Sequence, residues 1–202
     1  MTIIHVPRRF TRSHWGGTES VVLEVATRQQ RQGHQVAIWT TDALADRREE
    51  VIEGIEVRRF PYFYPWLGLS AEGRHAMDLK GGNLVSFPLM VALLRLPRID
   101  VLHLHTGNRL GGMVRTVARI RRVPYFVTIH GGLEDIPLSE QQSYREASRG
   151  ALEWGKVLGW LLGSRRVLRD AAGVLVLGRR EEEALRRRDP RIPVHRFCNG
   201  VD

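Results

Sequence analysis

The sequence predicts an α/β domain of the doubly wound type, with a mostly parallel, Rossmann-like sheet and helices on both faces. Short apolar runs rich in valine and isoleucine alternate with longer segments of helical spacing, which is the order of elements in βαβ units. The chain has 202 residues, of which 43% are hydrophobic and 26% are charged. These values are typical of one globular domain and argue against disorder or a coiled coil.

Strands are expected where a short apolar run is bounded by glycine, proline or polar residues. The first run, Ile3–Pro7, begins almost at the N-terminus and has the pattern of a buried strand. In order, the expected strands are Ile3–Pro7, Val36–Thr40, Ile55–Phe60, Val101–His105, Tyr125–Ile129, Val174–Leu177 and Val194–Phe197.

Helices are expected between these strands. In the first, Val22, Val25 and Ala26 lie on one face, and Gly33 suits a left-handed helix end. Residues 61–82 contain prolines and several glycines, and we expect them to be irregular. The expected helices are Glu19–Gln32, Leu84–Leu96, Gly111–Arg121 and Tyr144–Arg169.

The chain is basic, with a formal charge of +9, and only Lys80 and Lys156 among its 31 basic residues are lysines. Such a charge favours nucleic acid, a membrane surface or anionic substrates as partners. Acidic residues are mixed among the arginines and no recognition motif is present, so we expect no nucleic-acid partner. A single cysteine, Cys198, and an N-terminus without a signal-peptide pattern predict a cytoplasmic location.

The segment Gly16-Gly17-Thr18-Glu19 lies between the first expected strand and the first expected helix. Open α/β sheets bind ligands at this position, and the amides of a helix N-terminus favour phosphate. Two adjacent glycines allow a ligand to approach the backbone closely. A tight turn is the simpler alternative, with Glu19 serving only as an acidic residue favoured by the helix dipole.

Taken together, several segments resemble the N-terminal domain of a family-4-type glycosyltransferase of the GT-B fold, over about Ile3 to Asp202. The segments that carry the resemblance are Gly16-Gly17-Thr18-Glu19, Gly33-His34-Gln35-Val36, Asp100-Val101-Leu102-His103-Leu104-His105, Val127-Thr128-Ile129-His130-Gly131-Gly132 and Asn199-Gly200-Val201-Asp202.

The resemblance implies a retaining transferase that moves a sugar from a nucleotide-diphosphate sugar to a hydroxyl of a glycan, lipid or small-molecule acceptor. It implies no metal ion and no permanently bound cofactor. Residues 1–202 would form the acceptor-side domain, and the C-terminal domain that grips the nucleotide sugar would lie outside this sequence. We therefore expect this chain alone to be inactive.

The resemblance also assigns roles to individual residues. The amides of Gly16 and Gly17 would lie near the donor diphosphate, and His130 would be the catalytic residue beside the transferring sugar. Gly178 stands where the family commonly has a serine. Contacts to substrate are expected from Glu19, His105, Gly131 and Asn199.

The histidines permit a metal-binding alternative. His103 and His105 lie two apart on one strand and therefore face the same way, so with His130 they could hold zinc. Their spacing is not a zinc signature, and a buried hydrogen-bond network is the simpler expectation.

A second function class rests on the stretch Gly150–Gly163. Small residues recur there every four positions, which favours close approach of another backbone. Trp154, Val157, Leu158, Leu161 and Leu168 form a neighbouring apolar face beside Lys156, Arg165, Arg166 and Arg169. We expect this face to be buried against the sheet or a helix. The alternative is a helix on an anionic membrane, in a non-catalytic membrane-associated or binding module of the same fold that is peripheral at the inner membrane face.

Overall fold

A sheet of 8 strands forms the centre of the domain in the computed structural model, which describes residues 1–131 and 150–197. Its strands are β1 (Thr2–Val6), β2 (Gln35–Thr41), β3 (Glu49–Ile52), β4 (Ile55–Phe60), β6 (Val101–Leu104), β7 (Tyr125–Ile129), β9 (Gly173–Val176) and β10 (Val194–Arg196). Their order is β10-β9-β7-β6-β1-β2-β4-β3, and all pairings are parallel except that of β3 with β4. The chain therefore winds outward from β1 in both directions, as in a doubly wound fold.

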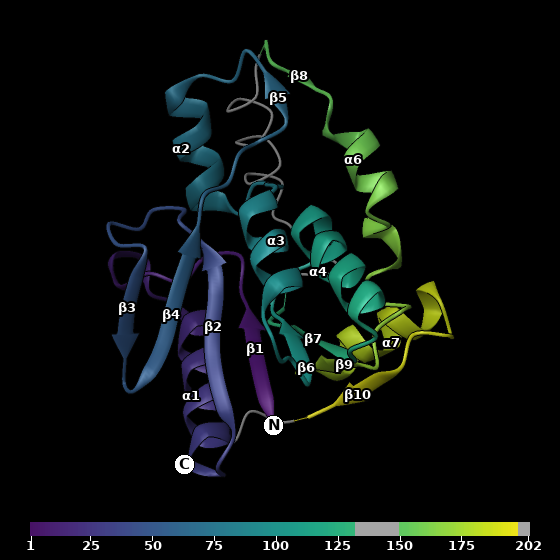
Figure 1. The fold of residues 1–202 in the computed structure, drawn as a ribbon. Helices are drawn as coiled ribbons and strands as arrows, with labels where there is room; N and C mark the ends of the chain where they lie inside the picture. Colours follow the sequence, from purple (N-terminus) through teal and green to yellow (C-terminus); the bar gives the residue numbers. More distant parts are fainter. Residues whose placement is uncertain (132–149, 198–202) are drawn as a thin grey trace.

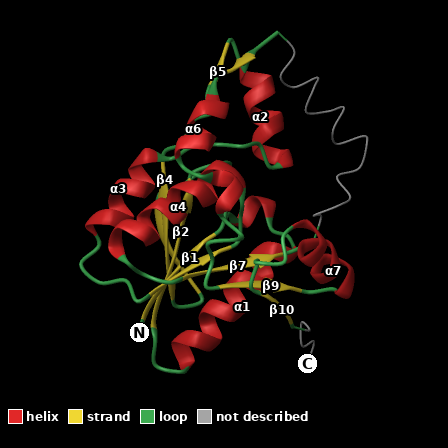
Figure 2. Ribbon diagram, turned by 90° about the vertical axis from the view of Figure 1, so that its right-hand side faces the viewer, coloured by secondary structure: helices red, strands yellow, loops and turns green. Residues whose placement is uncertain are grey.

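Helices cover both faces of this sheet. The helices are α1 (Gly17–Arg31), α2 (Ala71–Lys80), α3 (Phe87–Arg95), α4 (Asn108–Arg121), α6 (Gly155–Leu161) and α7 (Arg179–Arg188), with 3₁₀ turns η1 (Arg12–His14) and η2 (Ser164–Arg166). α1 lies on one face, and α3 and α4 lie on the other (Figure 1, Figure 2). A small second sheet pairs β5 (Trp66–Leu67) with β8 (Leu152–Glu153) near α2 and α6 (Figure 2).

Alternation along the strands divides the buried apolar residues between two cores. On β1, Ile3 belongs to the core under α1, while Ile4 and Val6 belong to the core under α3 and α4. Leu102 and Leu104 on β6 face the same way as Ile4 and are fully buried. Because successive side chains of a strand point to opposite faces, the residues between them must lie under α1.

The predicted fold class is confirmed. Each expected strand is present, with ends that differ by no more than one residue from the sequence-based bounds. Three of the expected helices correspond to α1, α3 and α4. Periodicity determined these elements locally, and α1 also has a glycine end, since Gly33 takes a left-handed φ of 85° just after it.

The prediction that residues 61–82 are irregular is wrong. They contain β5 and the helix α2, whose ends have clear caps. The Ser70 hydroxyl accepts a hydrogen bond from the Gly73 amide at 3.0 Å, and Gly81 ends the helix with a φ of 87°. Two further elements, β3 and α7, were not predicted. In α7 only Leu185 is buried, so the helix has no apolar stripe to detect.

The prediction of one long helix over Tyr144–Arg169 is also wrong for its described part. Residues 150–169 form β8, the short helix α6 and the turn η2 instead. Gly163 ends α6 with a φ of 63°, which is the left-handed conformation that glycine adopts easily. Of the predicted row of small residues, Ala147 lies outside the described residues and only Gly155 and Gly159 lie within α6.

Gly155 and Gly159 provide a matched pair for testing close packing. A Cβ on Gly155 would lie 2.6 Å from Arg109 Cζ and would overlap Pro65, whereas one on Gly159 would have 3.7 Å to its nearest neighbour. We predict that Gly155→Ala lowers the free energy of unfolding by about 1–3 kcal/mol through overpacking. Gly159→Ala is expected to be neutral or to stabilise α6 by up to about 1 kcal/mol. Urea unfolding checks both, and equal effects would contradict the packing argument.

Candidate functional site

Four histidines gather where β1, β6 and β7 end. His5 lies on β1, His103 on β6, His105 just after β6, and His130 just after β7. His5 and His103 are register partners across the β1–β6 pair. In a doubly wound sheet, the neighbouring strands from which the chain winds in opposite directions form the switch point where ligands bind. Here that point is between β1 and β6.

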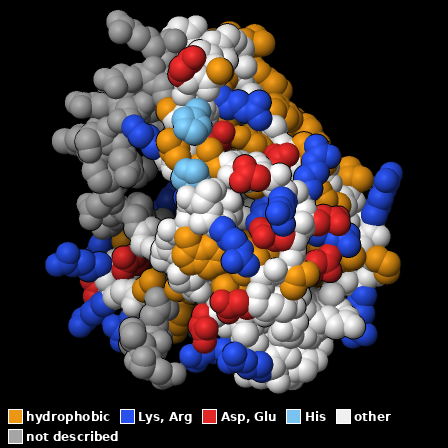
Figure 3. Space-filling model, turned by 90° about the vertical axis from the view of Figure 1, so that its left-hand side faces the viewer, with side chains coloured by type: hydrophobic (Ala, Val, Ile, Leu, Met, Phe, Trp, Pro, Cys, Tyr) orange, Lys and Arg blue, Asp and Glu red, His pale blue; other side chains and the backbone are white. Residues whose placement is uncertain are grey.

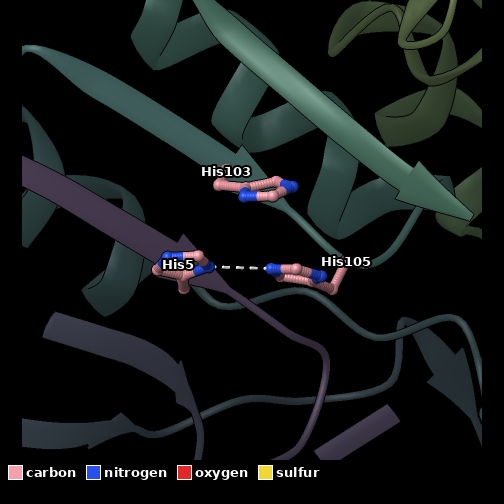
Figure 4. Close-up of side chains that lie close together, drawn as sticks. All are labelled: His5, His103 and His105. Carbon is pink, nitrogen blue, oxygen red and sulfur yellow. Dashed lines mark hydrogen bonds between the residues drawn. The ribbon is translucent and has the colours of Figure 1, made fainter. Parts of the chain in front are cut away.

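Hydrogen bonds join three of these rings end to end. Gln29 Oε1 lies 2.7 Å from His5 Nε2, and His5 Nδ1 lies 2.9 Å from His105 Nε2 (Figure 4). His105 Nδ1 lies 2.9 Å from His130 Nε2. We refer to Gln29, His5, His105 and His130 as the histidine chain. The histidine chain runs from α1, along the face of the sheet that α1 covers, to the end of β7.

His103 packs against the histidine chain without joining it. Its ring centre lies 4.3 Å from that of His105 and 4.9 Å from that of His5. Its Nε2 is instead 2.7 Å from Thr128 Oγ1 on β7. The sequence-based expectation of a buried hydrogen-bond network therefore holds for His103 and His105.

Burial keeps these rings neutral. It lowers the pKa of His5 to about 4, although the hydrogen bond with Gln29 acts in the opposite direction. Burial also lowers the pKa of His103 to about 3, with smaller contributions from His5 and His130. The pKa of His105 is well below its ordinary value for the same reason, and burial lowers that of His130 as well. At neutral pH each ring therefore has one N–H and one bare nitrogen.

A cavity of about 600 Å³ opens beside the histidine chain. His105, His130 and Gly131 line it, as does Thr18 at the start of α1. Arg165, Arg169 and Arg188 also line it and bring positive charge. The predicted residues His105, His130 and Gly131 are thus brought together at one site.

The glycine pair lies at the start of α1. Gly16 is the N-cap, and its amide donates a hydrogen bond to Glu19 Oε2 at 3.1 Å. Through this bond the Glu19 side chain caps the start of α1, and it is also buried and lies 3.6 Å from Arg9. The alternative expected from the sequence was an acidic first-turn residue favoured by the helix dipole. A Cβ on Gly17 would meet nothing within 4 Å. The space above Gly17 is therefore open to a ligand.

The cavity accounts for only part of the predicted positions. Gly178 precedes α7 and does not line it. Asn199 and Cys198 lie outside the described residues. The proposed ligand contacts of Gly16, Gly17, Glu19 and Asn199 remain predictions.

Sequence reasoning missed several residues of the site. His5 was detectable, because it occupies the same face of its strand as His103 and His105 do on theirs. Asn108 lines the cavity with a φ of 56°, a left-handed conformation that asparagine tolerates better than most residues. Arg165, Arg169 and Arg188 gave no local signal, since arginine is common throughout this chain.

Metal binding can be considered for a different set of histidines from the one expected. Within residues 1–131 and 150–197, the grouping with suitable geometry is His5, His103 and His105, whose ligand atoms lie within 4.8 Å of one another. His5 and His105 already bond each other through two of these nitrogens. A zinc ion needs about 2.0 Å to each nitrogen and would have to break that bond.

Comparisons with known proteins show a matching family and a similar solved structure. A family model described as a glycosyl transferase 4-like domain matches residues 16–200. Among solved structures, the chain is similar to the catalytic domain of starch synthase IV from Arabidopsis thaliana bound to ADP and acarbose, with a TM-score of 0.57 and 14% identity. The match covers 99% of this chain and 52% of that one, so this chain spans about half of that structure. The curated proteins contain no match.

The neutral histidines predict a pH-dependent stability. A ring whose pKa is lower in the folded state contributes stability above pH 6.5, and this contribution is lost as the pH falls toward the folded pKa. For His103, with a folded pKa of about 3, the contribution to the free energy of unfolding falls by about 2 kcal/mol between pH 7 and pH 5.

We therefore predict that His103→Gln reduces the difference in unfolding free energy between pH 7 and pH 5 by about 2 kcal/mol. Urea unfolding at the two pH values measures this difference. The control His75→Gln changes an exposed histidine of α2 and is expected to leave the wild-type difference in place. Identical pH dependence in both variants would show that His103 is not held neutral by burial.

Proposed function

The chain belongs to the family of glycosyl transferase 4-like domains, and on this basis we propose that it is the acceptor-side half of a glycosyltransferase. The observation that carries the proposal is the cavity beside His130, which lies at the switch point of the sheet and contains three arginines. We propose a nucleotide-diphosphate sugar as the donor and a hydroxyl group as the acceptor, with retention of configuration at the transferred carbon.

The reaction breaks the bond between the anomeric carbon and the diphosphate oxygen. The acceptor oxygen bonds to that carbon, and the hydroxyl proton leaves with the diphosphate. Negative charge grows on the leaving group, so positive groups lower the barrier most when they are placed there in advance. Arg165, Arg169 and Arg188 provide such charge within the cavity.

The start of α1 offers a further contact for the diphosphate. The first backbone hydrogen bond within this helix runs from the Ser20 amide to the Gly16 carbonyl. The preceding amides of Gly17 and Thr18 have no partner within the helix and carry the positive end of its dipole. Thr18 lines the cavity, which brings these amides to the proposed donor site.

A second domain completes the site in this proposal. The similar starch synthase structure is about twice as long as the matched region, and transfer without hydrolysis requires a cleft that excludes water. We propose that the partner domain supplies most of the nucleotide contacts. The 202-residue chain by itself is then expected to transfer no sugar.

His130→Ala tests the proposed catalytic residue in an enzyme that contains this domain and its partner domain. We predict that turnover falls by about 10²-fold or more, because a contact to the transition state is lost, while nucleotide affinity stays nearly the same. Measured kcat and nucleotide Kd separate the two effects. His195→Ala on β10 is the matched control, since His195 is exposed and does not line the cavity.

Wild-type turnover in His130→Ala would remove His130 from the site. Steady turnover of a nucleotide sugar by the isolated 202-residue chain would contradict the need for a partner domain.

A specific surface favours a second role, docking on an anionic membrane. The apolar strip consists of exposed residues from the β5–β8 sheet and α6: Leu67, Leu152, Trp154, Val157, Trp160 and Leu161. On the predicted apolar face, Trp154, Val157 and Leu161 are exposed, so the predicted burial is wrong for these residues, while Leu158 packs against the core as expected. Trp160, beside this face, is 77% exposed. Leu168 also packs on the core.

Positive charge flanks the apolar strip. Trp160 and Leu161 share one shallow hollow with Arg119, Arg165 and Arg166, and Lys156 is exposed on α6. An apolar surface with cations beside its α6 end matches the interface of a membrane with anionic headgroups. By contrast, positive and negative side chains are intermixed on the face seen in Figure 3. None of the described helices is long and apolar enough to cross a bilayer.

Vesicle binding tests the membrane proposal. We predict that the chain cosediments with vesicles containing phosphatidylglycerol, and that binding weakens as salt rises because the cations are screened. The double variant Trp160→Ser with Leu161→Ser is expected to lose most of this binding. Val51→Ser is the control, since Val51 is similarly exposed but lies on the edge strand β3, outside the apolar strip. Equal sedimentation with anionic and neutral vesicles, or without vesicles, would refute the proposal.

A further inference from the structure

The histidine chain has a direction that can be read from Gln29. In the structure the Gln29 amide presents Oε1 to His5 Nε2, and because an amide oxygen can only accept a hydrogen bond, His5 Nε2 carries the proton between them. A neutral His5 then has a bare Nδ1, which accepts a proton from His105 Nε2. In the same way His105 Nδ1 is bare and accepts from His130 Nε2. Each ring in turn fixes the tautomer of the next.

We propose that Gln29, through His5 and His105, holds His130 in the tautomer with a protonated Nε2 and a bare Nδ1. His130 then presents a hydrogen-bond acceptor and not a donor. Gln29, His5 and His105 are positioning residues in this proposal, because they act on His130 and need not touch a ligand. Gln29 lies on α1 and reaches His130, at the end of β7, through the rings of His5 and His105.

The low polarity of the surroundings makes this control effective. His5 and His105 are buried, so breaking one hydrogen bond of the histidine chain leaves a polar nitrogen without a partner and costs about 1–3 kcal/mol. A ring of opposite tautomer would place two N–H groups or two bare nitrogens against each other. The rings must therefore switch together or not at all. The orientation of the Gln29 amide determines which of the two arrangements forms, because its oxygen accepts and its nitrogen donates.

The last nitrogen of the histidine chain, His130 Nδ1, needs a hydrogen-bond partner. His130 Nδ1 is buried and has no hydrogen-bond partner among the described residues, and His130 lines the cavity. A group that pairs with a bare Nδ1 must donate a proton. Phosphate oxygens and carbonyls cannot do so at neutral pH, whereas a hydroxyl can. With the proposed function as a basis, the matching group is a sugar hydroxyl, so His130 orients the sugar and not the diphosphate.

The tautomer of His130 can be measured in the isolated chain by nitrogen NMR of histidine-labelled protein. Protonated and bare ring nitrogens have well-separated chemical shifts, and this readout does not depend on turnover. At pH 7 we expect a protonated Nε2 and a bare Nδ1 for His5, His105 and His130. A protonated Nδ1 on His130 in the wild-type chain would overturn the proposal.

Variants of Gln29 test whether it sets the direction. Gln29→Leu removes the acceptor, so the buried His5 Nε2–H loses its partner and the His130 signal is expected to move toward the Nδ1-protonated form. Gln29→Glu keeps an acceptor and is expected to retain the wild-type tautomer. Gln30→Leu is the matched control, because Gln30 lies next along α1 and donates to the Gly54 carbonyl instead. An unchanged His130 tautomer in Gln29→Leu would also overturn the proposal.

A kinetic measurement connects the proposal to the reaction in an enzyme with both domains. Gln29→Leu is expected to lower kcat by up to about tenfold, the value of one neutral hydrogen bond, and Gln29→Glu to restore it. If neither the wild type nor the variants transfer sugar, the proposed function fails while the NMR result still decides the tautomer.

Discussion

The burial of several imidazole rings on one face of a parallel sheet is the constraint on which the site depends. Apolar residues at Ile4, Val6, Leu102 and Leu104 fill the opposite face, and strand alternation leaves the intervening positions to histidine. A buried polar ring needs partners for its nitrogens, and neighbouring strands place those partners at hydrogen-bond distance. The rings therefore bond one another, and the end of the histidine chain comes to lie at the cavity.

Arginine holds the surrounding segments in place. Arg109 is buried in α4 and donates to the carbonyls of Gly155 and Asn83, while also pairing with Glu153. Arg115 is likewise buried and pairs with Asp170. These bonds attach β8, α6 and the following turn to the body of the domain. Part of the arginine-rich composition thus serves packing, since a guanidinium can satisfy several carbonyls at once.

The cavity and the apolar strip are adjacent features of one segment. Arg165 in η2 lines the cavity and also lines the hollow that contains Trp160 and Leu161. A membrane held at the apolar strip would lie next to the mouth of the proposed donor site. The histidine chain lies on the α1 face of the sheet and reaches the cavity at the end of β7.

The sequence by itself determined seven of the eight strands of the main sheet, three helices and their order along the chain, because periodicity acts over a few residues and Gly33 marks the end of α1. The family resemblance also singled out His105, His130 and Gly131, which line one cavity in the structure. Only the tertiary structure decided that His5 and Gln29 join these histidines, because contacts across 100 and 24 positions leave no local pattern. The end of α6 at Gly163 and the exposure of Trp160 were also set by packing, since the same apolar spacing fits a buried helix and an exposed one.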